Sequence, residues 1–258
     1  MQTVKFSIGN NGVDFQGYLH DDLSNIWKSY DRRPAVIIFP GGAYKAHSLR
    51  EEDPVTIPLL AAGYQVFVLT YSVLDQIRTS APEEEAALCV KLLKEKADEF
   101  HIDPDRIAVL GFSAGGHLAA SIACHWKKFG PEARPDAAVL CYPVITTGKY
   151  AHRESSNNIT CHNDALLGYY SLETQVTDDT VPCFIWHTGE DEAVNVRNSR
   201  MFYSALLDHH VPAELHVYEK GVHGLSMGHL ETGPEMVNIQ TWITLAVNWL
   251  NERWNFRL

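Results

Sequence analysis

Six short apolar runs, separated by longer stretches with helical spacing, constrain the fold of this chain more than any other feature. They span residues 35–39, 65–70, 107–110, 137–141, 183–187 and 214–218, and Gly, Pro or charged residues bound each of them. Several runs are apolar at every position, which is typical of parallel strands that are covered on both faces. The alternation therefore predicts an α/β fold with a mostly parallel central sheet and helices on both sides.

The stretches between these runs carry the expected helices. The clearest covers residues 82–100, where apolar residues recur every three or four positions and Ser80 with Glu83 resembles a capping box. Further helices are expected at residues 53–62, 114–129, 195–208 and 235–254, and an antiparallel hairpin within the first 33 residues.

The length of 258 residues is compatible with one α/β domain, residues 1–258. Between two of the expected strands, residues 143–182 form a long stretch rich in Thr, Asn, His and Tyr. An excursion of this length in a compact domain is usually functional, so we expect a cap-like insertion there.

Composition excludes several classes of protein. The chain has 21 Lys and Arg against 32 Asp and Glu, so a nucleic-acid partner, which needs an excess of basic residues, is not expected. No apolar run approaches the ~20 residues that span a bilayer and no secretory signal is visible, so we expect a soluble cytoplasmic protein. The five cysteines, an odd number in mostly apolar surroundings, predict free buried thiols.

The sequence GFSAG, residues 111–115, lies directly between an expected strand and an expected helix. A serine on such a tight turn projects its hydroxyl out of the fold, and the flanking glycines remove side chains that would collide. Ser113 is therefore the predicted nucleophile. Residues 224–228, GLSMG, match the same pattern, but they follow no adjacent strand and precede a poor helix, so Ser226 is not expected to act in this way.

A serine hydroxyl needs a base to remove its proton and a carboxylate to orient that base. In folds of this kind the acid and then the histidine follow the serine, each on a loop after a strand. Asp191 follows the run 183–187, and His223, between two glycines, follows the run 214–218. We therefore predict a triad of Ser113, Asp191 and His223. Alternatives for the acid and the base are Glu190, Glu192 and His229.

Acyl transfer also needs hydrogen-bond donors for the developing oxyanion. The turn PGGAY, which follows the run 35–39, contains Gly42 and Ala43. Their backbone N–H groups are expected to meet that of Ala114, the residue after the nucleophile, because the two loops end neighbouring strands. These three N–H groups form the predicted oxyanion hole.

Metal and nucleotide sites are not expected. Cys161-His162 and His209-His210 lack the second ligand pair of a zinc site, and no HExxH spacing occurs. GGAYKAHS does not match GxxxxGK[ST], and GFSAGG does not match GxGxxG. The sequence therefore predicts no metal and no cofactor.

Four stretches, PGGAY, HIDPDRIAVLGFSAGGHLAA, SLETQVTDDTVPCFIWHTGEDEAV and KGVHGLS, resemble the α/β-hydrolase superfamily. The resemblance is specifically to its small bacterial esterases, such as acetylxylan and related carbohydrate esterases, and covers residues 30–252. It implies the α/β-hydrolase fold and ester hydrolysis through an acyl-serine intermediate, without a cofactor. It also implies a short acyl group such as acetyl, on a sugar or another small polar alcohol. The residue roles that it implies are those named above.

One departure from the related hormone-sensitive-lipase type concerns the turn after the first apolar run. Those esterases carry HGGG where this chain has Pro40, Gly41, Gly42 and Ala43. Alanine still supplies an N–H group, but proline replaces a histidine that normally braces the loop. The substrates of those lipases are therefore not expected for this chain. Aromatic and polar residues near the site are expected either to contact a polar alcohol or to pack inertly. The candidates are Tyr44, Tyr150, His152, Tyr169 and Tyr170.

Three alternative functions remain as hypotheses. An arylformamidase and a prolyl-peptidase-like hydrolase use the same triad on the same fold, but this chain has no room for the large gating domain of the peptidase. A hydrolase-fold binding protein without catalysis would usually lack a triad member, and all three candidates are present here. The expected protein is a serine carboxylesterase with a small-molecule ester substrate, and a homo-oligomer is compatible with the sequence.

Overall fold

The computed structural model describes residues 1–22, 31–78 and 81–258. The chain begins with the expected antiparallel hairpin, formed by β1 (Gln2–Ile8) and β2 (Val13–Leu19). Residues 23–30 of the expected hairpin region lie outside the described residues, as does Ser80 of the expected capping box. The other residue of that box, Glu83, hydrogen-bonds His125 and Tyr169, and the helix begins after Ala81 without a side-chain cap.

Eight strands of the described chain form one sheet in the order β1-β2-β4-β3-β5-β6-β7-β8. The other strands are β3 (Arg33–Phe39), β4 (Gln65–Leu69), β5 (Ile102–Phe112), β6 (Ala137–Cys141), β7 (Cys183–Thr188) and β8 (Ala213–Tyr218). Strands β3 to β8 are parallel, whereas β2 pairs with β1 and β4 in the antiparallel sense. Every residue of β3, β4, β6 and β7 is buried, so the prediction of a mostly parallel, doubly covered sheet is confirmed.

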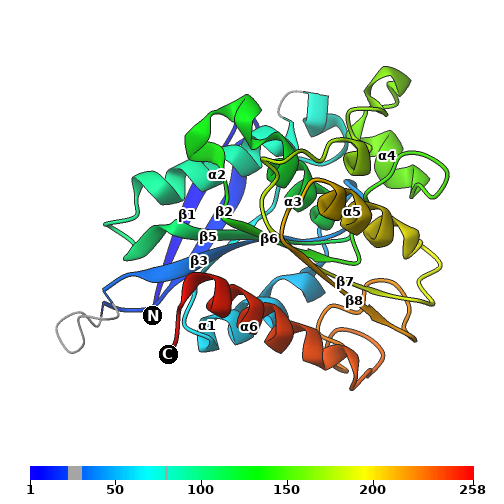
Figure 1. Ribbon diagram of the computed structural model, residues 1–258. Helices are drawn as coiled ribbons and strands as arrows, with labels where there is room; N and C mark the ends of the chain where they lie inside the picture. The colour runs from blue at the N-terminus through cyan, green and yellow to red at the C-terminus, as the bar shows by residue number, and fades with distance from the viewer. Residues whose placement is uncertain (23–30, 79–80) are drawn as a thin grey trace.

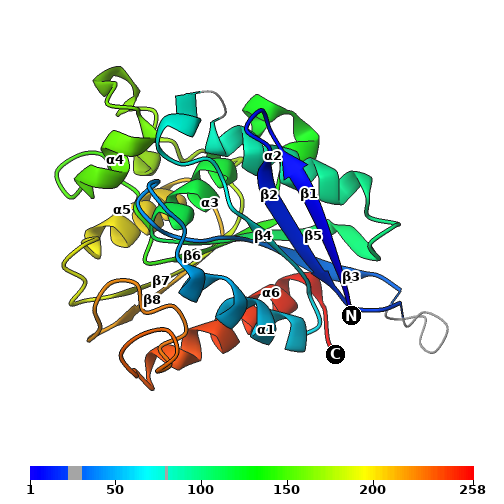
Figure 2. The ribbon, with the colours of Figure 1, turned by 180° about the vertical axis from the view of Figure 1, so that it is seen from behind.

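Helices cover both faces of this sheet. They are α1 (Asp53–Ala61), α2 (Pro82–Glu95), α3 (Ala114–His125), α4 (Arg153–Ile159), α5 (Arg197–Asp208) and α6 (Trp242–Trp254). Figures 1 and 2 show α1 and α6 on one face and α2, α3 and α5 on the other. The α/β fold class predicted from the alternating pattern is therefore confirmed.

Three helix boundaries differ by four or more residues from the sequence prediction. The helix expected at residues 82–100 ends at Glu95, the one expected at residues 114–129 ends at His125, and the one expected at residues 235–254 begins at Trp242. In the first case the chain continues in turns that still bury Ala97 and Phe100. Because turns bury apolar side chains at a spacing close to that of a helix, the apolar pattern runs past the true helix end.

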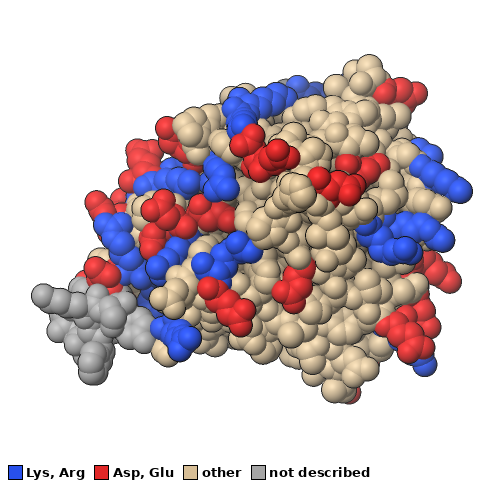
Figure 3. All heavy atoms as spheres, in the orientation of Figure 1, with Lys and Arg blue, Asp and Glu red and all other residues tan. Residues whose placement is uncertain are grey.

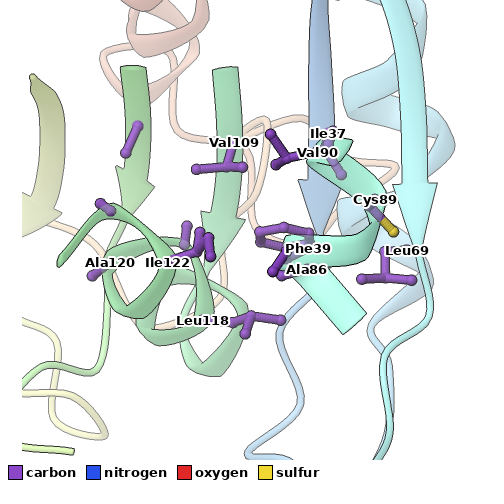
Figure 4. Close-up of a cluster of buried hydrophobic side chains, with 14 of the residues drawn as sticks. Ile37, Phe39, Leu69, Ala86, Cys89, Val90, Val109, Leu118, Ala120 and Ile122 are labelled. Carbon is purple, nitrogen blue, oxygen red and sulfur yellow. The ribbon is translucent and has the colours of Figure 1, made fainter. Parts of the chain in front are cut away.

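The apolar side chains of the strands divide between two cores, one on each face of the sheet. Ile37 points into the core below α2 and α3, where it lies near Val90 (Figure 4). Its neighbours Val36 and Ile38 point the other way, into the core that includes Trp242 of α6. All five cysteines are free, as predicted, and three are buried, whereas Cys124 and Cys161 are only partly buried.

The carboxyl ends of the parallel strands position the candidate residues. Loops that follow β3, β5, β7 and β8 carry, in that order, the PGGAY turn, Ser113, Asp191 and His223. Because these strands are parallel, their carboxyl ends lie along one edge of the sheet, where α/β folds bind ligands. Residues 142–182, which connect β6 to β7 and include α4, leave the sheet at the same edge.

The surface mixes charges of both signs. On the face that Figure 3 shows, Lys and Arg side chains are interspersed with those of Asp and Glu. Across residues 1–22, 31–78 and 81–258, no helix has the length and apolar character needed to cross a membrane.

Candidate active site

Ser113 occupies a sharp turn between β5 and α3, with backbone angles φ 52° and ψ −114°. A non-glycine residue in this region is strained, so the surrounding structure must hold it in place. The two motif glycines permit the turn, because a Cβ on Gly111 would lie 2.0 Å from the Gly115 carbonyl oxygen. A Cβ on Gly115 would lie 2.0 Å from the Phe39 carbonyl oxygen. The GFSAG pattern is therefore required by close packing of backbone against backbone.

The structure brings together the three residues predicted as a triad. Nε2 of His223 lies 2.8 Å from Oγ of Ser113, and Nδ1 of His223 lies 2.7 Å from Oδ2 of Asp191. The second carboxylate oxygen, Oδ1, accepts hydrogen bonds from the backbone N–H groups of Ala193 and Val194 at 3.0 and 2.8 Å. The Asp191 side chain is fully buried, whereas that of His223 is 23% exposed. The buried Asp191 carboxylate thus holds the His223 ring on one side, while part of the ring is exposed to solvent.

A second histidine, His187 on β7, also contacts the Asp191 carboxylate. Its Nε2 lies 2.8 Å from the Val194 carbonyl oxygen and 3.2 Å from Asp191 Oδ2, and its Nδ1 lies 2.7 Å from Ser199 Oγ. Because a carbonyl only accepts, Nε2 carries the proton and donates, while Nδ1 accepts from the serine hydroxyl. Burial alone would raise the pKa of Asp191, but the hydrogen bonds from His187 and His223 hold that pKa well below its usual value. Asp191 is therefore ionised at neutral pH.

The alternatives left open by the sequence are placed differently. Glu190 and Glu192 are both exposed, and Glu190 accepts a hydrogen bond from a backbone N–H of the following loop. His229 is exposed, and its ring makes no hydrogen bond within the part of the chain that the structure describes. In the second GxSxG match, Ser226 is buried and its hydroxyl donates to the Arg50 carbonyl oxygen at 2.6 Å. None of these four side chains hydrogen-bonds Ser113 in the described structure.

The PGGAY turn, residues 40–44, is called here the Gly-Gly loop, and it lies against Ser113. A Cβ on Gly41 would be 3.1 Å from the Ser113 Cβ. Gly42 and Ala43 both have positive φ angles, and both line one cavity with Ser113. Among the described residues, no acceptor binds the N–H groups of Gly42, Ala43 or Ala114. Gly42 and Ala43 line the cavity with Ser113, and Ala114 directly follows Ser113, so these three N–H groups stay the candidate oxyanion donors.

Three side chains from other segments hydrogen-bond the backbone of the Gly-Gly loop, and one of them is Tyr71, whose hydroxyl donates to the Pro40 carbonyl oxygen at 2.6 Å. The buried carboxylate of Glu51 accepts from the Gly41 N–H at 2.6 Å and from the Tyr142 hydroxyl at 2.7 Å. Asn158, on α4, donates from its side-chain amide to the Ala43 carbonyl oxygen at 2.8 Å. These contacts hold the Pro40–Gly41 and Ala43–Tyr44 peptide groups. The two peptide groups that flank Gly42 are held by backbone N–H groups of Ser48, Lys45 and Ala46, which donate to the Gly41 and Gly42 carbonyl oxygens.

A cavity of about 250 Å³ opens beside Ser113 and His223. Besides these two residues and the Gly-Gly loop, its wall is formed by polar side chains from two further segments and by Gly224. The side chains are those of Ser48, Arg50, Glu51, His152 and Glu154. No cluster of three or more His, Cys, Asp or Glu residues suited to a metal ion occurs in residues 1–22, 31–78 and 81–258.

Two tyrosines proposed to contact substrate are buried away from this cavity. The Tyr44 hydroxyl donates to Nδ1 of His117 at 2.8 Å, because Nε2 of that histidine donates to the Tyr170 carbonyl oxygen. The side chains of Tyr44 and Tyr170 are 1% and 6% exposed. Their predicted role in substrate binding is wrong, because each side chain packs into the core instead of lining the cavity.

The other two tyrosines also lie outside the cavity. The Tyr169 ring stacks on His125 at the far end of α3, about 18 Å from Ser113 at 1.5 Å per helical residue. Its hydroxyl donates to the buried Glu83 at 2.8 Å. Tyr150 lies beside the cation of Arg197, and neither tyrosine lines the cavity. The predicted substrate contacts of Tyr169 and Tyr150 therefore remain predictions, which the lining of this cavity does not support.

Comparison with known proteins identifies relatives of this arrangement. The BD-FAE family model matches residues 22–137. Endo-1,4-beta-xylanase B of Butyrivibrio fibrisolvens is 36% identical over 229 residues, which are 83% of this chain and 35% of that protein. Acetylxylan esterase of Xylanibacter ruminicola is 30% identical over 203 residues, which are 75% of this chain and 41% of that protein. The chain therefore spans about two-fifths or less of the length of these curated relatives.

Solved structures match over nearly the whole chain. The acetyl ester-xyloside bifunctional hydrolase of Caldicellulosiruptor lactoaceticus is 34% identical with a TM-score of 0.84, covering 96% of this chain and 90% of that one. MGS-M1, an alpha/beta hydrolase from a deep-sea metagenome library, is 33% identical with a TM-score of 0.83, covering 99% of both chains. This chain belongs to the α/β-hydrolase esterases. The resemblance identified from the sequence motifs is thereby confirmed.

Sequence reasoning missed several residues at the site of this α/β hydrolase. His187 lies inside a strand and Glu51 in a polar stretch, so neither carries a local signal for contact with Asp191 or Gly41. Asn158 lies more than a hundred residues from the loop that it holds. Only His152 had been singled out, as one of the polar residues of the long segment between β6 and β7.

Proposed function

We propose that this α/β hydrolase is a serine esterase that cleaves short-chain esters, chiefly acetyl esters, of sugars or other small polar alcohols. The observation that carries the proposal is the unbroken chain of hydrogen bonds from Ser113 through His223 to Asp191. The names of the acetylxylan esterase and of the acetyl ester-xyloside hydrolase support the acyl group and the sugar alcohol.

In the first half-reaction, the Ser113 hydroxyl oxygen attacks the ester carbonyl carbon while its proton passes to Nε2 of His223. Negative charge develops on the carbonyl oxygen, which accepts hydrogen bonds from the N–H groups of Gly42, Ala43 and Ala114. Asp191 stays ionised and stabilises the imidazolium through Nδ1. The intermediate then collapses, the bond from carbon to the alcohol oxygen breaks, and that oxygen takes the proton from Nε2.

In the second half-reaction, water attacks the acyl group on Ser113. His223 accepts the proton of the water and then returns it to the Ser113 oxygen as the carboxylic acid leaves. The partial exposure of His223 and the open cavity beside it give water a path to the acyl-enzyme.

The space near Ser113 favours a small acyl group. Val144 is anchored beside the nucleophile, because its N–H donates to the Ser113 carbonyl oxygen at 3.0 Å. Between Val144, Tyr44 and Ile159 the side chains leave a void too small for a water molecule.

Hydrolysis of p-nitrophenyl acetate by Ser113→Ala tests the proposal. We expect a loss of kcat of several orders of magnitude, because removal of a triad serine leaves only binding and oxyanion stabilisation. Ser121→Ala is the matched control: Ser121 lies on the same helix, its buried hydroxyl has no hydrogen-bond partner in the described structure, and the variant should keep wild-type kcat. Undiminished hydrolysis by Ser113→Ala would refute the assignment.

Two further measurements separate the rival functions. Stoichiometric labelling by a serine-directed phosphonate, located at Ser113 by mass spectrometry, would count against a binding protein without catalysis. A panel of acetyl, butyryl and octanoyl esters, acetylated xylosides and formyl-kynurenine compares kcat/KM across acyl length and leaving group. A preference for formyl-kynurenine over every ester would replace the esterase proposal by an arylformamidase.

A further inference from the structure

The segment between β6 and β7 supplies part of the cavity wall. His152 and Glu154, at the start of α4, line the same cavity as Ser113 and His223. Glu154 forms an ion pair with Lys45 at 3.1 Å, and Lys45 directly follows the Gly-Gly loop. The start of α4 is therefore tied to the rim of the cavity.

The His152 ring is oriented by its own helix. The Ser155 N–H donates to Nδ1 of His152 at 3.3 Å, and the Ser155 hydroxyl lies 2.8 Å from the same nitrogen. Because a backbone N–H only donates, Nδ1 is unprotonated and the proton of the neutral ring is on Nε2. Burial, and after it the neighbouring His223, lower the pKa of His152, so the ring is neutral at pH 7.

The Nε2–H group of His152 has no acceptor among the described residues, although the ring is partly buried. His152 lines the cavity while its Nδ1 turns back to Ser155, which leaves the Nε2 edge of the ring to face the cavity. An oriented donor that finds no partner in the protein is suited to a ligand oxygen.

The position of His152 also indicates which half of an ester it would meet. His223 must return its proton to the departing alcohol oxygen, so the alcohol half lies beside His223. His152 and His223 line the same cavity, together with Gly224, which directly follows His223. The Nε2–H group therefore lies on the alcohol side of the site.

We propose that His152 is a specificity-determining residue, whose Nε2–H donates to a second oxygen that the leaving alcohol carries next to the ester bond. The proposal rests on the esterase function above and narrows its substrate class to esters of sugars and other polyols. The neighbouring Glu154 carboxylate, held at the rim by Lys45, is an acceptor for the proton of that second hydroxyl. A simple alkyl ester offers neither interaction.

Two esters with the same acyl group and carbon chain isolate this contact. Glycerol 1-monoacetate carries hydroxyls beside the ester, whereas propyl acetate carries none. The measured quantity is the ratio of kcat/KM for the monoacetate to kcat/KM for propyl acetate. It is compared among the wild type and three variants.

His152→Asn keeps an acceptor for the Ser155 N–H, because asparagine is a good N-cap, but its side chain is too short to donate into the cavity. We expect it to lower the ratio roughly three- to tenfold, the effect of one neutral hydrogen bond. His152→Gln reaches about as far as Nε2 and should restore part of the ratio. His162→Asn is the matched control: His162 is exposed, with a φ of 61° that asparagine adopts readily, and its variant should match the wild type.

The outcomes distinguish this proposal from the one on which it rests. An unchanged ratio in His152→Asn, or an equal loss of kcat/KM on both esters, would overturn the role of His152. If Ser113→Ala is inactive in the same assays, the esterase proposal survives that result. If Ser113→Ala still hydrolyses both esters, the esterase proposal fails, and the His152 proposal that rests on it fails as well.

Discussion

Glu51 joins three segments of the site through one buried carboxylate, and its replacement tests how the Gly-Gly loop is held. One oxygen accepts from the Gly41 N–H at 2.6 Å, and the other accepts from the Tyr142 hydroxyl at 2.7 Å. The Tyr142 oxygen in turn accepts from the Ser226 N–H at 3.0 Å, in the loop that follows His223. Through Tyr142, the Glu51 side chain therefore links the Gly-Gly loop to the loop that carries His223 and Ser226.

The substitutions Glu51→Gln and Glu51→Ala should lower the free energy of unfolding by different amounts. Glutamine can still accept from Gly41, but its NH₂ group then faces the Tyr142 oxygen and the tyrosine O–H loses its acceptor. Leaving one buried donor unpaired should lower the free energy of unfolding by about 1–3 kcal/mol. Alanine removes both acceptors and leaves a cavity, so we expect a loss of about 3–5 kcal/mol.

The value of kcat should depend on whether the hydrogen bond to the Gly41 N–H is kept. Because glutamine retains that contact, kcat for p-nitrophenyl acetate should fall by less than about tenfold. Alanine frees the loop that carries two of the proposed oxyanion donors, and kcat should fall about 10²- to 10³-fold with little change in KM. The loss appears in kcat because the donors act on charge that exists only in the transition state.

The assay combines urea unfolding with steady-state kinetics on folded protein. Glu52→Gln is the control, because Glu52 is the neighbouring residue and its buried Oε1 has no hydrogen-bond partner in the described structure. That variant should keep wild-type kcat. If Glu51→Ala lost stability but kept wild-type kcat, Glu51 would be structural only and the reasoning would be refuted.

Three further predictions concern the triad and one tyrosine. His223→Ala should abolish ester hydrolysis while His229→Ala keeps it, and the reverse result would transfer the base to His229. Asp191→Asn should lower kcat about 10⁴-fold. Because hydrogen bonds lower the pKa of Asp191 in the folded protein, ionised Asp191 stabilises the fold above about pH 4. This stabilisation is lost as the pH falls further. Urea titrations should therefore show that the difference in unfolding free energy between the wild type and Asp191→Asn becomes smaller in acid. Tyr169→Phe should cost about 1.5–3 kcal/mol of stability, through the lost hydrogen bond to the buried Glu83 carboxylate, and leave kcat/KM unchanged; a selective loss of kcat/KM would return Tyr169 to the substrate site.

Local patterns predicted most of the elements and the three residues that meet at the site. The apolar runs located the six parallel strands, because a strand buried on both faces must be apolar at almost every position. The GFSAG turn is equally local, since both glycines are required by contacts within or beside the motif. Asp191 and His223 were found because each follows a strand directly, and the ends of parallel strands share one edge of the sheet.

The four tyrosines show what local sequence patterns could not predict. An aromatic residue near a site has the same sequence signature whether its hydroxyl faces a ligand or a buried partner. Tyr44 donates to His117 and Tyr169 donates to Glu83, and both partners come from distant helices. Their burial depends on how α2, α3 and the segment between β6 and β7 pack together.

What the sequence determined by itself was the fold class, the strained serine turn and the order of the acid and base. These depend on periodic burial and on backbone contacts over a few residues, which the chain encodes locally. Only the tertiary structure decided that His187 shares the Asp191 carboxylate, that Glu51 holds Gly41, and that His152 faces the cavity. Each of these contacts joins loops that are brought together by the sheet, so its energy depends on distances that no stretch of sequence specifies.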